Sequence, residues 1–216
     1  MTKNHGPFDP KPYQKQLIKL LLKLQSEENL TIKTFNQILK TEPKDGGGFF
    51  SKAELITAYE TYAGTQGIKV YNHSFIDKIK MKPVRTISGV TPITVLTKPY
   101  PCPGGCIFCP NDIRMPKSYL SDEPGAQRAA KNNFHPYLQT YNRLDAYKSI
   151  GHKVDKAELI VLGGTWSFYP ESYQIWFIKE MFRALNDFGS GRDDRPNMEK
   201  QASPQKVPEK IIQRDK

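Results

Sequence analysis

Three cysteines lie close together in the stretch PCPGGCIFCP, residues 101–110, and they are the only cysteines of the 216-residue sequence. Their spacing is C-x3-C-x2-C, formed by Cys102, Cys106 and Cys109. Three thiolates can bind three irons of a four-iron, four-sulfur cluster, which leaves the fourth iron without a protein ligand. Phe108, just before the last cysteine, would shield such a cluster from water. The spacing therefore predicts a [4Fe-4S] cluster with one iron open to chemistry.

Two other kinds of site use similar cysteines. Cys106 and Cys109 alone form a CxxC pair, which is typical of redox proteins. The three cysteines together with His135 could instead bind a structural zinc ion. Zinc sites usually show paired CxxC units or a histidine near the cysteines, whereas His135 lies in a predicted helical stretch away from the loop. We therefore favour the cluster over both alternatives.

Charge and composition narrow the setting of this site. The sequence has 32 basic and 22 acidic residues, a net charge of +10, which favours a polyanionic partner such as nucleic acid. An odd number of cysteines argues against a disulfide framework and for metal or redox chemistry in a reducing compartment. No apolar run approaches the roughly 18 residues of a membrane span, and the amino terminus lacks the apolar stretch of a secretory signal. We expect a cytoplasmic protein without a membrane span.

The elements that would position the cysteines fall into three regions. Residues 1–83 carry apolar side chains at helical spacing, among them Leu17 and Leu21, which predicts a helical bundle with these side chains facing its core. SKAE at residues 51–54 has the form of a capping box. Residues 84–188 contain two runs typical of buried strands, TPITVLTKP and AELIVLGG, each followed by helical patterns. Strand, helix, strand, helix is the order of a parallel α/β sheet or barrel. Residues 189–216 have few apolar side chains, which predicts a disordered polar tail.

Each predicted strand is followed by a loop that could take part in binding a cofactor. In parallel α/β barrels the functional loops leave the carboxyl ends of the strands, where the cysteine loop and the glycine pair Gly163-Gly164 both lie. The cysteine spacing is similar to the signature of the radical S-adenosylmethionine (SAM) enzymes. In that superfamily SAM chelates the open iron, and an electron from the cluster cleaves it to a 5′-deoxyadenosyl radical. The resemblance implies that Gly163, Gly164 and Thr165 line the SAM site, although a glutamate often follows the glycines elsewhere.

Longer motifs between about Lys80 and Phe188 resemble the catalytic subunit of Elongator and its bacterial and archaeal relatives. They are KPVRTISGVTPITVLTKPYPCPGGCIFCP, PKSYLSDEPGAQRA, NRLDAYKSIGHKVDKAELIVLGGTWSFYP and YQIWFIKEMFRALNDF. The resemblance implies an α/β fold, with an amino-terminal helical bundle followed by the first βα units of a partial radical SAM (β/α) barrel. It implies that Cys102, Cys106 and Cys109 are the cluster ligands.

The same resemblance implies a substrate and a surface that binds it. The family acts on the wobble uridine of tRNA and uses acetyl-coenzyme A (acetyl-CoA) to build a carboxymethyl group at carbon 5 of the base. Lys80, Lys82 and Arg85 lie within the block of family motifs and between the two predicted domains, so we expect them to contact tRNA phosphates. The lysines repeated along the first predicted helix are interpreted instead as a solvated helix face.

One expectation concerns the rest of the enzyme. The family has a complete barrel followed by an acetyltransferase domain, and no motif of either is recognised after Phe188. We therefore expect a truncated or split form, with a carboxy-terminal partner chain or domain that supplies the missing strands and the acetyltransferase. Two alternatives stay open, namely a catalytically inactive tRNA-binding module and a structural zinc-binding protein.

Overall fold

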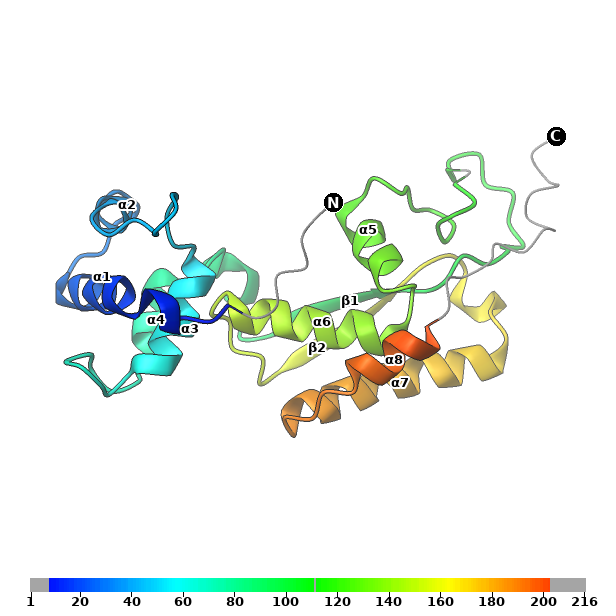
Figure 1. Ribbon diagram of the computed structural model, residues 1–216. Helices are drawn as coiled ribbons and strands as arrows, with labels where there is room; N and C mark the ends of the chain where they lie inside the picture. Colours follow the sequence, from blue (N-terminus) through cyan, green and yellow to red (C-terminus); the bar gives the residue numbers. More distant parts are fainter. Residues whose placement is uncertain (1–7, 111, 203–216) are drawn as a thin grey trace. The chain divides into compact units, whose positions relative to one another are not determined.

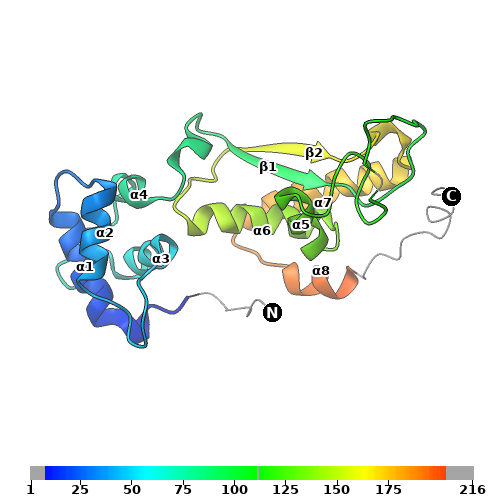
Figure 2. The same ribbon diagram turned by 90° about the horizontal axis from the view of Figure 1, so that it is seen from above.

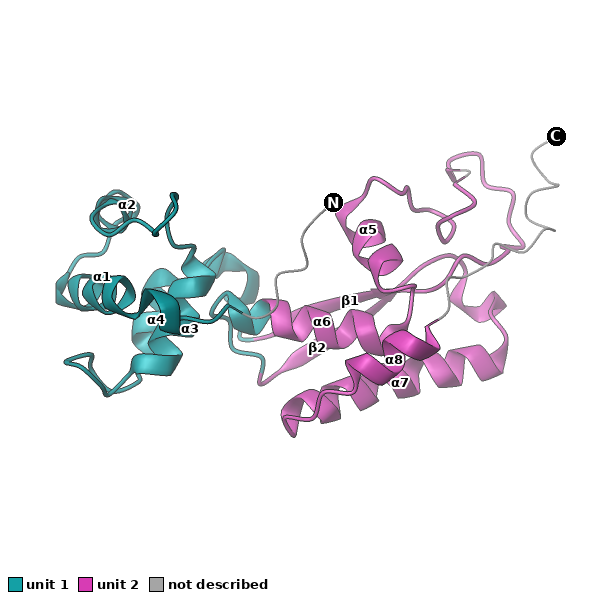
Figure 3. Ribbon diagram, in the orientation of Figure 1, with its two compact units in different colours: residues 1–89, 147–154 teal, residues 90–146, 155–216 magenta. Residues whose placement is uncertain are grey.

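The structure divides into two compact units. The computed structural model describes residues 8–110 and 112–202 (Figure 1). The first unit comprises residues 1–89 and 147–154, and the second comprises residues 90–146 and 155–216 (Figure 3). In the described part of the chain, no helix has both the length and the hydropathy that crossing a membrane requires.

The first unit extends past the predicted boundary at residue 83 and takes in a distant turn. The amide of Met81 donates to the carbonyl of Ile150 at 3.1 Å, and the His152 side chain contacts the same stretch of chain. These long-range bonds join residues 147–154 to the helical region, which a boundary drawn along the sequence could not include. That residues 1–83 form a tRNA-binding domain and residues 84–188 a partial radical SAM domain stays a prediction.

The first unit is built from short helices around one apolar core. Its elements are η1 (Lys11–Tyr13), α1 (Gln14–Ser26), α2 (Ile32–Lys40), α3 (Lys52–Tyr62), α4 (His73–Ile79) and η2 (Pro83–Thr86). Side chains predicted to face the core, such as Leu17 and Leu21, are fully buried. The capping box is also confirmed. The Glu54 amide donates to the Ser51 hydroxyl at 3.2 Å, and the Ser51 amide donates to the Glu54 carboxylate at 2.7 Å.

The second unit contains two parallel strands with helices beside them. Its elements are β1 (Thr91–Leu96), α5 (Pro124–Lys131), α6 (Pro136–Ser149), β2 (Ala157–Leu162), η3 (Trp166–Phe168), α7 (Glu171–Gly189) and α8 (Arg195–Gln201). The register pairs Thr91 with Ala157 and runs to Leu96 with Leu162. Figure 2 shows α6 and α7 on the same side of the strands. This order of elements is compatible with the predicted α/β class, while a barrel remains a proposal because the described sheet has two strands.

The predicted disorder of residues 189–216 is wrong for its first part. Helix α7 continues to Gly189, and α8 then folds back, with Met198 only 4% exposed. Met198 lies in a cluster of buried residues on α6 and α7, namely Tyr137, Leu138, Tyr141 and Ala184. Residues 203–216 of the predicted tail lie outside the described residues.

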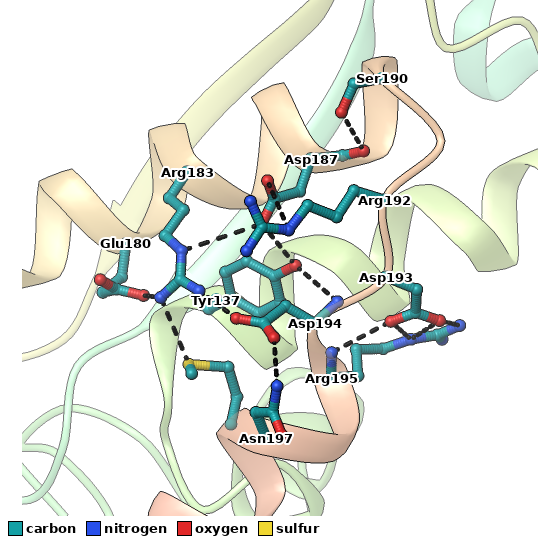
Figure 4. A network of polar contacts seen from close by, with 11 residues as sticks. Tyr137, Glu180, Arg183, Asp187, Ser190, Arg192, Asp193, Asp194, Arg195 and Asn197 are labelled. Atoms are coloured by element: carbon teal, nitrogen blue, oxygen red, sulfur yellow. Dashed lines mark hydrogen bonds and ion pairs between the residues drawn. The ribbon is translucent and has the colours of Figure 1, made fainter.

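A polar network explains why a segment with so few apolar residues is ordered (Figure 4). Arg183 of α7 forms an ion pair with Asp194, and the Asp194 amide donates to the Tyr137 hydroxyl oxygen at 3.2 Å. Tyr137 in turn donates to the Asp187 carboxylate at 3.0 Å. Arg195 reaches Asp145 of α6 at 3.0 Å. Composition alone misses this stabilisation, because it depends on charged partners on two other helices.

The burial of Met198 leads to a prediction about stability. We expect Met198→Ala to lower the free energy of unfolding by about 2 kcal/mol, because it leaves a cavity against α6 and α7. Met198→Leu preserves the volume and should cost less than about 1.5 kcal/mol. Chemical denaturation of the full chain measures both values. Equal stability of the alanine variant and the unchanged chain would show that α8 does not pack as described.

Candidate functional site

The parallel pairing of β1 and β2 brings the cysteine loop and the glycine pair to the same edge of the sheet. The register ends with Leu96 opposite Leu162, and the Thr97 amide continues it by donating to the Leu162 carbonyl at 2.8 Å. The chain after Thr97 contains the three cysteines, and the chain after Leu162 contains Gly163 and Gly164. The carboxyl ends of parallel strands are where ligands of α/β proteins bind.

The three thiols of this loop are free, and two of them lie near hydroxyl groups. The Cys102 sulfur is 3.2 Å from the Thr165 hydroxyl, a contact that joins the cysteine loop to the loop after β2. The Cys109 sulfur is 3.8 Å from the Ser118 hydroxyl. The Thr165 hydroxyl, followed by the Gly104 backbone amide, lowers the pKa of the Cys102 thiol below its ordinary value. A lowered pKa favours the thiolate, which is the form that binds metals.

The loop backbone at Gly104 lies beside two of the sulfurs. A Cβ atom at Gly104 would lie 3.5 Å from the Cys106 sulfur and 3.9 Å from the Cys102 sulfur. Across the described residues, however, no group of three or more His, Cys, Asp or Glu side chains lies close enough to hold a metal ion. The structure thus places the three cysteines in one loop without bringing their sulfurs together. Their role as ligands stays a proposal.

A small, half-open cavity lies at the loop after β2. It has a volume of about 120 Å³ and is lined by Thr97, Tyr119, Val161, Leu162, Gly163, Gly164 and Trp166. Gly163 has φ +155°, and a Cβ atom there would lie 1.9 Å from the Thr97 hydroxyl oxygen. Only glycine lets the two strand ends approach this closely. Gly164 has more room, since its Cβ would lie 3.4 Å from Lys117 Cβ.

Aromatic residues after the glycine pair fasten the two loops together. The Tyr169 hydroxyl donates to the Lys98 carbonyl at 2.8 Å and lies 2.8 Å from the Thr97 hydroxyl, which must then donate to it. The Tyr173 hydroxyl accepts from the Lys98 amide at 3.0 Å. Tyr100 stacks on Tyr169 with ring centres 4.9 Å apart. We did not predict these contacts, although the aromatic run WSFYP, which follows Thr165, is a visible signal.

A glutamine completes the support of β1. The Gln139 side chain on α6 donates to the Leu96 carbonyl at 2.9 Å and accepts from the Leu96 amide at 3.0 Å. These two bonds satisfy backbone groups at the edge of β1 that does not face β2, as a neighbouring strand would. Gln139 is buried and holds the strand end from which the cysteine loop departs.

Phe108 is exposed on the cysteine loop, whereas His135 is buried against α7. The Phe108 side chain is 93% exposed, so its predicted shielding role stays a prediction. His135 is buried and packs edge-on against Trp176 of α7, with ring centres 5.3 Å apart. Burial, followed by the charge of Arg183, lowers the pKa of His135 to about 4. The described residues therefore do not place His135 with the cysteines in a zinc site.

The predicted RNA-binding residues lie in the first unit, at and beyond the end of α4. Lys82 and Arg85 are exposed, while Lys80 is partly buried and pairs with Asp77 at 2.8 Å. Two lysines of α1 pair instead with Glu42, Lys19 at 3.8 Å and Lys23 at 3.1 Å. Their partner supports the interpretation of these lysines as a solvated face.

Comparison with known proteins finds relatives that match about half of this chain. The tRNA uridine(34) acetyltransferase of Methanocaldococcus infernus is 45% identical over 115 residues, and that of Dehalococcoides mccartyi is 46% identical over 107 residues; each match covers 50% of this chain. The human Elongator complex protein 3 is 38% identical over 127 residues, or 54% of this chain. No family model matches the chain.

These matches confirm the resemblance drawn from the sequence motifs. The matched segments span 22% or 23% of the length of these relatives, so the similarity concerns a limited part of each of them. The chain resembles an amino-terminal part of the Elongator catalytic subunit over that segment.

The close approach at Gly163 leads to a prediction with a matched control. We expect Gly163→Ala to lower the free energy of unfolding by about 1–3 kcal/mol, since the new methyl group collides with Thr97. Gly164→Ala should cost less, because its Cβ is in ordinary contact range and its φ is not positive. Urea denaturation of both variants compares them directly. A larger loss for Gly164→Ala would contradict the described geometry.

Proposed function

We propose that this chain is the cluster-binding part of a radical SAM enzyme that modifies the wobble uridine of tRNA. One observation carries the proposal: three free thiols and a glycine pair lie at the carboxyl ends of two paired parallel strands. Relatives that match half the chain are named for acetylation of tRNA uridine(34) or as Elongator complex protein 3. Such names support a transferase at the level of the family, and the cofactors are part of our proposal.

The donor set fits an iron–sulfur cluster better than a structural zinc ion. Three thiols within one loop match the three protein ligands of a four-iron cluster, and the absence of a side chain at Gly104 leaves room beside two of them. With bound SAM, a [4Fe-4S] cluster would supply the electron that cleaves the sulfonium. Cys102, Cys106 and Cys109 would hold it once the loop brings their sulfurs together, and Phe108 would then shield it.

The loop after β2 would bind SAM. Gly163 and Gly164 present backbone close to the cavity of about 120 Å³, where no side chain of their own blocks the approach of an amino group. Thr165 would lie between the SAM site and the cysteine loop, because it follows Gly164 and its hydroxyl is 3.2 Å from the Cys102 sulfur. The fastening of Tyr169 to Thr97 and Lys98 would keep the two loops at a fixed separation during binding.

Metal content tests the cluster assignment. We expect anaerobic reconstitution with iron and sulfide to give a brown chain with about four irons. Cys106→Ala should abolish this, since it removes one of three ligands. Ser118→Ala, which removes only a hydroxyl 3.8 Å from the Cys109 sulfur, should retain the cluster. Stoichiometric zinc without iron uptake would contradict the assignment and support the structural zinc alternative.

The tRNA would bind the basic segment that follows α4. Lys82 and Arg85 are exposed, and Lys80 would contribute once its contact with Asp77 is exchanged for a phosphate. The net charge of +10 provides the long-range attraction. If the cysteines prove to bind no cluster, this surface alone would support the alternative of an inactive tRNA-binding module.

Salt-dependent binding tests this surface. We expect Lys82→Ala with Arg85→Ala to weaken tRNA binding and to lower the slope of log affinity against log salt by about 1.5, since each phosphate contact contributes about 0.7 to 0.9. Lys19→Ala with Lys23→Ala is the matched control of equal charge, because both lysines pair with Glu42. Equal effects of the two double variants would contradict a localised site.

We further propose that the second unit needs additional strands to complete the reaction. The apolar residues of β2 from Leu159 to Leu162 are only partly buried, whereas Ile93 and Val95 of β1 are fully buried. Along α7, Ile175, Ile178 and Phe182 lie on one face and are 62%, 36% and 55% exposed. A carboxy-terminal part, joined or separate, would cover this face, complete the barrel and supply the acetyl-CoA site.

An activity assay tests this need. We expect the reconstituted chain with reductant, SAM, acetyl-CoA and tRNA to give no multiple turnovers of carboxymethylated uridine by mass spectrometry, and co-expression with the carboxy-terminal part of a relative to restore them. Ile178→Glu with Phe182→Glu should prevent the rescue, whereas Lys131→Glu on the exposed surface of α5 should not. Multiple turnovers by the chain alone would refute the proposal.

A further inference from the structure

A buried histidine joins both ends of the basic segment that follows α4. His152 is 4% exposed, and its Nε2 atom lies 2.7 Å from the Met81 carbonyl oxygen. Its Nδ1 atom lies 2.7 Å from the Thr86 hydroxyl. A carbonyl oxygen only accepts, so Nε2 carries the proton, and a neutral ring then accepts the Thr86 proton at Nδ1. Both ring nitrogens are therefore used on one stretch of six residues.

The conformation of this stretch is unusual enough to need such support. Lys82 has φ +51° and ψ +57°, the left-handed region that a lysine rarely adopts. The Arg85 amide donates to the Lys82 carbonyl at 3.0 Å and closes the short helix η2. The segment between the two contacts of His152 thus holds Lys82 and Arg85 in a compact turn with exposed side chains.

Several contacts hold the turn that contains His152 in place. The preceding Gly151 has φ +88°, and a Cβ atom there would lie 2.9 Å from both Ile76 Cγ2 and Lys80 Cβ. This turn is thus packed against α4, and the Met81 amide donates to the Ile150 carbonyl at 3.1 Å. The ring of His152 also packs edge-on against Tyr147, with centres 5.3 Å apart. The backbone bond and the Nε2 contact hold Met81 at the start of the basic segment, and the Nδ1 contact holds Thr86 at its end.

We infer that His152 is a positioning residue that preorganises Lys82 and Arg85 as a binding site for the phosphates of structured RNA. This inference rests on the proposed tRNA binding. Two cations on a flexible chain lose conformational freedom when they bind adjacent phosphates, and that loss weakens binding. Ordering the turn before RNA arrives removes part of this loss. His152 acts through its two neighbours in the turn and does not itself contact the RNA.

A double-mutant cycle on the full chain separates positioning from general destabilisation. The probe is a tRNA transcript with uridine at the wobble position. We expect His152→Gln and the milder Thr86→Val to weaken binding about two- to ten-fold, the range for one additional side chain that must be ordered on binding. In the Lys82→Ala/Arg85→Ala background the same substitutions should have no further effect, because the residues that they position are gone.

A control variant and a spectroscopic signature complete the test. Tyr59→Phe removes a hydroxyl that accepts from the Asn72 amide at 2.9 Å in the same unit, and it should leave the affinity unchanged. The 15N chemical shifts of His152 should indicate the Nε2–H tautomer, and Thr86→Val should shift the Nδ1 resonance.

Four results would overturn the inference. Binding that needs Lys82 and Arg85 but tolerates both His152→Gln and Thr86→Val would overturn it while leaving the proposed tRNA binding intact. Equal losses from these substitutions in both backgrounds would indicate a general loss of structure, and so would a loss in Tyr59→Phe. No binding of the probe by the unchanged chain would overturn the proposed tRNA binding as well.

Discussion

The candidate site depends on one constraint, the in-register parallel pairing of β1 with β2. Parallel strands cannot be joined by a tight turn, so the chain must cross back through α5 and α6 before β2 begins. Both strands then end at the same edge, where the Thr97 amide still bonds to the Leu162 carbonyl. A slip of one residue would reverse which side chains face the helices and would separate Gly163 from Thr97.

Side-chain hydrogen bonds hold the ends of the two strands and the loops that follow them. Gln139 satisfies the outer backbone groups of Leu96, and Tyr169 joins Thr97 and Lys98 to the loop after β2. The cysteine loop itself has fewer anchors, chiefly the contact of Cys102 with Thr165. For the proposed cluster, the cysteine loop would have to bring its three sulfurs together beside this edge, because no three possible ligands among the described residues lie close enough to hold a metal ion.

Much of the framework could be predicted from the sequence, because local patterns determine it. Helical spacing identified Leu17 and Leu21 as core, and SKAE identified the start of α3. The two strands were recognisable from their β-branched and apolar runs, and the cysteine spacing indicated where the site would lie. The longer motifs indicated a resemblance to a family, which the relatives confirm over about half the chain. The barrel and the cofactors go beyond what these patterns establish.

The features that escaped prediction are those built from residues far apart in the sequence. Helix α8 is ordered because Arg183 and Asp145 supply partners for its charges, so its low apolar content misled the prediction of disorder. Gln139 and His152 are single polar residues whose importance appears only when their backbone partners are located. A polar side chain with a distant main-chain partner leaves no periodic signal in the sequence.

The most direct test of the central claim, that the cysteine loop binds a cluster with an open iron, is electron paramagnetic resonance of the reconstituted, chemically reduced chain with and without SAM. An open iron should bind the amino and carboxylate groups of SAM and change the signal of the reduced cluster, because a ligand at one iron alters the electronic structure of the whole cluster. We expect a four-iron signal whose g values shift when SAM is added. A signal that SAM leaves unchanged, or the lack of any cluster signal, would contradict the claim.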